Sequence, residues 1–112
     1  MFLFKINNFD PKYRPGFDIL DSGLRCLNEL NSCDTEYILH DVVPNLAKVM
    51  SGELTEYEFG YDATVIDVEA DKSIINYNYF EDRIEISTKD LYYFIHEWEN
   101  AIKKWEDDDA NV

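Results

Sequence analysis

Residues 55–87 read TEYEFGYDATVIDVEADKSIINYNYFEDRIEIS, and apolar and polar side chains alternate along most of this segment. Ile66 and Val68 therefore share one side of an extended chain, because successive side chains of a strand point to opposite faces. Short segments at 70–72 and 80–82 separate the alternating runs at lengths typical of hairpins. The segment predicts an antiparallel meander with one buried and one solvent-facing side.

A long helix should follow the meander, because apolar residues recur there at steps of four and three. This stripe consists of Leu91, Ile95, Trp98, Ile102 and Trp105. Ser87 or Thr88 can cap the start of the helix. The acidic run at 106–109 opposes the negative end of the helix dipole. We therefore expect the helix to end near Trp105 and residues 107–112 to form a frayed acidic tail.

A second helix is predicted in the middle of the chain. Asp34 or Thr35 can cap it, and Gly52 follows its last apolar position as a left-handed stop. Pro44 falls inside this segment and lacks the N–H that a helix interior requires. The helix should be kinked there or begin afresh near Val43.

The first third of the chain has a weaker pattern. Residues 2–6 alternate as a short strand, and residues 7–17 contain two prolines and a glycine, which predict a loop. The apolar spacing from 20 to 31 fits a helix. A turn at 21–23 could instead join strands at 17–20 and 24–27, and we favour this hairpin.

Length and composition fit one α+β domain. The chain has 112 residues, of which 46% are hydrophobic and 15% aromatic, so it can fill one core. We expect a single domain over residues 1–106, with an antiparallel sheet packed against the C-terminal helix and the kinked middle helix. No apolar run suits a membrane span or a secretory signal, which predicts a cytoplasmic protein.

Acidic residues dominate the second half of the chain. Asp and Glu number 24 against 10 Lys and Arg, which gives a net charge of −14. Residues 1–56 hold nine acids and five bases, whereas residues 57–112 hold fifteen and five. This balance argues against direct binding to nucleic acid or to an anionic membrane. It favours a cationic protein partner.

The sequence contains no recognisable motif for catalysis, a cofactor or a metal. Glycine-rich phosphate loops and the common hydrolase motifs are missing, and the terminal acids lack the spacing of a calcium loop. Cys26 or Cys33 with His40 could in principle form a nucleophile and base, and His96 flanks the helix stripe. We expect a non-catalytic protein with reduced cysteines, and a small cysteine enzyme is one alternative.

Four features of the second half occur together: EFGY at 58–61, an acidic hairpin from Ala63 to Tyr79, RIEISTKDL at 83–91, and Trp98 within the last helix. In this respect the chain resembles small bacterial immunity proteins of polymorphic toxins, including those of contact-dependent growth inhibition. The resemblance implies a cytosolic protein that binds and neutralises the C-terminal toxin domain of a delivered effector. Such toxins are frequently nucleases, and many act on transfer RNA.

The acids of the meander are the candidate contact residues. An acidic surface can cover the basic surface with which a nuclease binds phosphates, and opposite charges speed association. The predicted partner-binding residues are Glu58, Tyr61, Asp62, Asp67, Glu69, Asp71, Glu81 and Asp82. Two further alternatives are an acidic nucleic-acid mimic that inhibits a DNA- or RNA-binding protein, and a non-catalytic adaptor. The pattern leaves the oligomeric state open.

Overall fold

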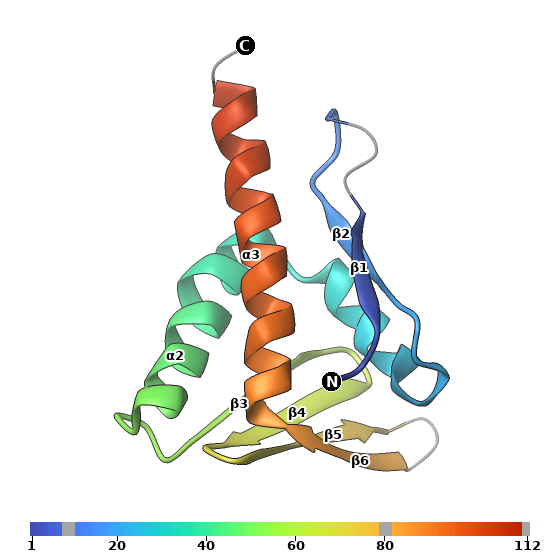
Figure 1. The fold of residues 1–112 in the computed structure, drawn as a ribbon, viewed down its shortest axis with the longest axis vertical. Coiled ribbons are helices and arrows are strands. Elements are labelled where there is room, and N and C mark those ends of the chain that lie inside the picture. Colours follow the sequence, from blue (N-terminus) through green and yellow to red (C-terminus); the bar gives the residue numbers. More distant parts are fainter. Residues whose placement is uncertain (8–10, 79–81, 111–112) are drawn as a thin grey trace.

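A computed structural model of the chain describes residues 1–7, 11–78 and 82–110. Within these ranges, antiparallel strands form a two-stranded and a four-stranded sheet, and the helices pack on one side of the larger sheet (Figure 1). The expected α+β class with an antiparallel meander is confirmed. The strands are β1 (Phe4–Asn7) and β2 (Gly16–Ile19) in the small sheet, and β3 (Glu56–Tyr61), β4 (Thr64–Glu69), β5 (Lys72–Tyr77) and β6 (Asp82–Ser87) in the large one.

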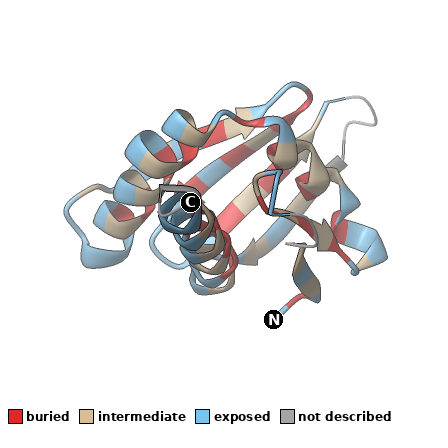
Figure 2. Ribbon diagram, turned by 90° about the horizontal axis from the view of Figure 1, so that it is seen from above, coloured by how far each residue is buried: buried red, intermediate tan, exposed pale blue. Residues whose placement is uncertain are grey.

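The register of the meander confirms that its two faces differ. One row of cross-strand neighbours consists of Phe59, Ile66, Ile75 and Ile84, and the next row consists of Glu58, Asp67, Ile74 and Glu85. The first row faces the helices, and its members on β3, β4 and β5 are buried. Figure 2 shows the buried parts of the strands gathered beneath the helices. The second row belongs to a face that no described helix covers.

Helix α3 (Thr88–Ala110) begins as predicted, because the Ser87 hydroxyl accepts a hydrogen bond from the Asp90 N–H at 3.4 Å. Its first turns contact β5 and β6, and the rest rises away from the sheet beside the β1–β2 hairpin (Figure 1). The helix continues to Ala110, so the expectation of an end near Trp105 is wrong. The Trp105 indole N–H donates to the Pro11 carbonyl at 2.9 Å and holds that turn. The acids at 106–108 are exposed, so water screens their repulsion.

The middle helix is interrupted where Pro44 predicts an interruption. A short α1 (Thr35–Tyr37) leads into a π-helical turn (Ile38–Val42), after which α2 (Val43–Ser51) begins with Pro44 in its first turn. The Val43 N–H donates to the Ile38 carbonyl, five residues back, and this wider turn accommodates the proline. Gly52 ends α2 in the left-handed conformation, with φ of 85°.

The predicted hairpin between 17–20 and 24–27 is wrong. Residues 22–32 form a 3-10 helix, η1 (Ser22–Ser32), and the strand at 16–19 pairs with β1 instead. Leu24, Leu27 and Leu30 are buried. The segment is kinked at Leu24, with φ of −122° and ψ of 18°, and the step from Leu27 to Leu30 matches the three residues per turn of a 3-10 helix. The Asp21 carboxylate accepts from the Gly23 N–H, so Asp21 caps this helix rather than turning a hairpin.

Side chains from η1 also close the outer edge of β2. Asn28 Oδ1 accepts from the Ile19 N–H at 3.0 Å, and Asn31 Oδ1 accepts from the Phe17 N–H at 3.0 Å. Asn31 Nδ2 donates back to the Phe17 carbonyl at 2.9 Å. These two asparagines therefore take the place of a third strand and pair the N–H and carbonyl of Phe17 and the N–H of Ile19.

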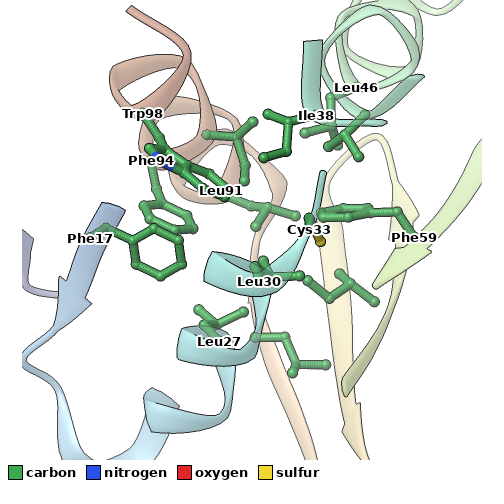
Figure 3. Close-up of a cluster of buried hydrophobic side chains, with 14 of the residues drawn as sticks. Phe17, Leu27, Leu30, Cys33, Ile38, Leu46, Phe59, Leu91, Phe94 and Trp98 are labelled. Atoms are coloured by element: carbon green, nitrogen blue, oxygen red, sulfur yellow. The ribbon is translucent and has the colours of Figure 1, made fainter. Parts of the chain in front are cut away.

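One hydrophobic core joins all these elements. Phe17 of β2 packs edge-on against Phe94 and Trp98 of α3, with ring centroids 4.7 Å apart in both pairs (Figure 3). The Trp98 indole N–H donates to the Pro15 carbonyl at 2.9 Å. Contacts continue without a break from these rings to Phe59 of β3. The described residues thus form a single globule, and no helix among them is long and apolar enough to cross a membrane.

Candidate functional site

The face of the meander that points away from the helices is hollowed, and it is the candidate site. The hollow has a volume of about 810 Å³. Its lining comes from all four strands and consists of Glu56, Tyr57, Glu58, Asp67, Val68, Glu69, Lys72, Ile74, Arg83 and Glu85. Half of these side chains are acidic, and the surface is broad and open rather than a deep pocket.

Two pairs of acids lie side by side on β3 and β4. Glu56 is the cross-strand neighbour of Glu69, and Glu58 is the neighbour of Asp67. Asp71, in the turn after β4, lines a second hollow of about 510 Å³ together with Glu56 and Glu69. We call these five residues the acidic face. Like charges directly opposite each other destabilise a sheet, so this arrangement costs the isolated protein stability.

The strongest sign of this repulsion is at Glu58. A hydrogen bond from one carboxyl group to the other, together with the negative charge of Asp67, raises the pKa of Glu58 above its ordinary value. Asp67 also accepts a hydrogen bond from Asn76 Nδ2 at 3.1 Å. A cation placed between the two carboxylates would relieve their repulsion.

The charge changes sign across the open face. Lys72 of β5 and Arg83 of β6 line the same hollow as the acidic face, and Lys72 Nζ lies 3.9 Å from Glu85 Oε1. Ile74 lies between the two halves and is half-buried. The surface therefore combines an acidic half on β3 and β4, a mixed half on β5 and β6, and an apolar side chain between them.

The structure brings together Glu58, Asp67, Glu69 and Asp71 of the predicted contact set. Tyr61 and Asp62 lie at the other end of β3: alternation places Tyr61 on the same side as Phe59, and Asp62 occupies the β3–β4 turn with φ of 53°. Tyr61 is 45% exposed. These two residues are therefore separate from the acidic face.

The remaining two predicted residues follow β5. Asp82 is the first residue of β6 and the cross-strand neighbour of Tyr77. Glu81 lies outside the described residues. Glu56, by contrast, was not in the predicted contact set and belongs to the acidic face. Alternation does place Glu56 on the solvent-facing side with Glu58, since it precedes Glu58 by two residues on the same strand.

The cysteines and histidines lie apart from this face. The Cys33 thiol donates weakly to the Gly60 carbonyl at 3.9 Å, and burial raises its pKa to about 11 although nearby Arg14 acts in the opposite direction. This thiol is protonated at neutral pH and is a poor nucleophile. His40 is exposed, and its Nε2 lies 3.5 Å from Glu36 Oε2. Within the described ranges, no three potential metal ligands cluster.

Comparison with protein-family models, curated proteins and solved structures finds no match for this chain. What the open face can do is therefore inferred from its shape and charge.

Proposed function

We propose that this protein is a non-catalytic immunity protein that neutralises a cognate toxin domain, a nuclease such as a tRNase, by masking the toxin's basic substrate-binding surface. One observation carries the proposal: two acids of β3 each face an acid of β4 on an uncovered, concave side of the sheet. Glu56 faces Glu69, and Glu58 faces Asp67. A nuclease must present Lys and Arg to bind phosphates. The same groups can bind carboxylates.

The energetics of the acidic face support a cationic partner. Each facing pair of carboxylates repels, and the raised pKa of Glu58 reports this repulsion. An arginine inserted between Glu58 and Asp67 would donate to both carboxylates at once, a geometry that favours guanidinium over ammonium. In the complex, the attraction of both carboxylates to the arginine would offset their mutual repulsion. Binding would therefore recover part of the folding free energy that this repulsion costs the free protein.

The rest of the surface supports a protein partner in particular. Ile74 offers apolar contact next to the charges, and Lys72 and Arg83 can pair with acids of the partner. The net charge of −14 attracts a basic domain over a longer range and speeds the encounter, which matters when the target is toxic.

The regular placement of the acids favours one alternative, a nucleic-acid mimic. The two pairs follow one another at the two-residue repeat of a strand, about 7 Å apart. A mimic would inhibit many basic proteins, whereas an immunity protein should discriminate between toxins. Lys72 and Arg83 on the same face fit the immunity function better, because they interrupt the uniform negative charge that a mimic needs.

The decisive experiment mixes the protein with the basic toxin domain encoded beside it, and measures binding by calorimetry and protection of cells expressing the toxin. The double variant Glu58→Gln and Asp67→Asn should weaken binding by about tenfold or more, because it removes the facing carboxylates. The variant Glu106→Gln and Asp108→Asn removes the same charge from the exposed end of α3 and is the matched control. The proposal fails if no heat and no protection are observed, or if the control loses as much affinity as the site variant.

A further inference from the structure

Sheet edges carry unpaired backbone groups, and in this fold side chains pair some of these groups on β2 and on β3. Asn28 and Asn31 close β2, as described above. At β3, the Gly60 N–H donates to the Tyr37 hydroxyl at 3.3 Å, and the Gly60 carbonyl accepts from the Cys33 thiol. The outer backbone groups of β3 at Gly60 are therefore not open to another strand.

The outward backbone groups of β6 form the edge on the other side of the sheet. β6 is the last strand in the sheet order and lies at the free margin of the sheet (Figure 1). The Thr88 N–H donates to the Asp71 carbonyl at 3.2 Å, which makes these opposed residues a hydrogen-bonded pair. Counting back by twos, Ile86 and Ile84 bond toward β5, so Arg83 and Glu85 direct their N–H and C=O groups outward.

No partner for these outward groups is found in the part of the chain that the structure describes. The backbone hydrogen bonds outside paired strands and helices do not involve Arg83 or Glu85. Both side chains are exposed, on the open face, and Ile84 between them is half-buried on the helix side. This edge is thus a short, accessible strand with one cationic, one apolar and one anionic residue in sequence.

This order of residues is complementary to itself. When β6 is placed antiparallel to a second β6 about Ile84, Arg83 lies opposite Glu85 of the second copy, and Glu85 lies opposite Arg83 of that copy. Both positions have outward backbone groups, so each pair can exchange both backbone hydrogen bonds. Centring the pairing on Arg83 or on Glu85 would instead place two like charges opposite each other, which is unfavourable. Charge and hydrogen bonding therefore select the same register.

We infer that the protein forms a two-fold dimer through β6, centred on Ile84, in which two four-stranded sheets join into one eight-stranded antiparallel sheet. The two-fold axis is perpendicular to the sheet, so both acidic faces lie on the same side. The dimer does not depend on the proposed function. The net negative charge of each copy opposes dimerisation, but the acidic face lies on β3 and β4, away from β6. Repulsion between exposed charges is largely screened beyond about 8 Å at physiological ionic strength.

The test measures molar mass by sedimentation or light scattering over micromolar to millimolar concentrations at physiological ionic strength. The wild type should approach twice the mass of one chain as concentration rises. Arg83→Glu and Glu85→Arg should each weaken dimerisation by about tenfold or more, because each places two like-charged pairs across the interface. Lys89→Glu makes the same charge change as Arg83→Glu at an exposed position outside β6, and should dimerise like the wild type.

Mixing the two single variants distinguishes a lost interface from a lost fold. In a mixed dimer, each Glu at 83 or 85 again faces an Arg, so the mixture should recover the dimer that neither variant forms alone. The double variant Arg83→Glu with Glu85→Arg should also recover it. A wild type that stays monomeric at the highest concentration overturns the inference. So do single variants that dimerise as tightly as the wild type, or a mixture that stays monomeric.

Discussion

Glu58 of β3 and Asp67 of β4 are cross-strand neighbours on the open side of the sheet, and Asp67 raises the pKa of Glu58. Opposite-charge or apolar pairs at such a position stabilise a sheet, whereas two like charges destabilise it. Here the fold keeps two acids together and compensates elsewhere, with one core that runs from β3 to α3. Several measurable consequences arise from this relationship and from the contacts around it.

The first prediction concerns the pH dependence of stability. Because the pKa of Glu58 is raised on folding, the folded chain binds more protons than the unfolded chain between the ordinary and the raised value. The free energy of unfolding should therefore fall as pH rises through that interval. Glu58→Gln should raise the thermal midpoint at neutral pH, and the gain should vanish below the ordinary glutamate pKa. Thermal unfolding at a series of pH values measures this, with Glu106→Gln as the control; an equal gain at every pH would contradict it.

The second prediction concerns the side chains that close β2. Asn31→Ala removes the groups that pair with both the N–H and the carbonyl of Phe17, and should lower the free energy of unfolding by about 1–3 kcal/mol. Asn31→Asp keeps the acceptor and loses the donor, so its cost should be smaller than that of the alanine variant. Urea denaturation gives both values. If aspartate costs as much as alanine, the Phe17 N–H bond contributes nothing.

The third prediction concerns Gly60, where β3 approaches β4 closely. A Cβ added at Gly60 would lie 2.1 Å from the Thr64 carbonyl oxygen and 2.9 Å from Val65 Cα, and both are backbone atoms. Gly60→Ala should therefore destabilise the fold by about 3 kcal/mol or more. At Gly23 the nearest atom would lie at 3.5 Å, so Gly23→Ala is the matched control with a small expected effect. Equal denaturation midpoints for the two variants would show that the close approach is absent.

The fourth prediction concerns thiol reactivity. Burial holds the pKa of Cys33 near 11, so this thiol should react with iodoacetamide far more slowly at pH 8 than it does in denaturant. Mass spectrometry of peptides labelled for increasing times gives the rate at each cysteine, and half-buried Cys26 provides the internal comparison. Rapid labelling of Cys33 in the folded protein would contradict its buried position and would revive the cysteine-enzyme alternative.

The meander and the last helix could be predicted from the sequence because local periodicity reports burial directly. Ile66 and Trp98 each belong to a regular run of apolar positions, and both are buried where the pattern places them. The bounds of the middle helix could be predicted for a similar reason, since Pro44 restricts its own backbone and Gly52 tolerates the left-handed turn. Each of these inferences needs only residues within a few positions of one another.

Longer-range contacts account for what the sequence did not reveal. The steps of three from Leu24 to Leu30 fit more than one structure, and the choice depends on Asn28 and Asn31 bonding to a strand many residues away. Likewise, the Trp105 contact with Pro11 is invisible to a local pattern. For the site, alternation found Glu58, Asp67 and Glu69, but only the register shows that Glu58 and Asp67 are neighbours and that Tyr61 lies elsewhere.

The two indole bonds of α3, from Trp98 to Pro15 and from Trp105 to Pro11, span most of the chain. During synthesis, the segment around Phe17 leaves the ribosome before α3. Its aromatic contacts with α3 can form only after α3 has also emerged. The β1–β2 hairpin should consequently stay open to proteases and chaperones until Trp98 and Trp105 have left the ribosome. A nascent chain released before Trp98 would then lack a closed core, even if its four-stranded sheet had already formed.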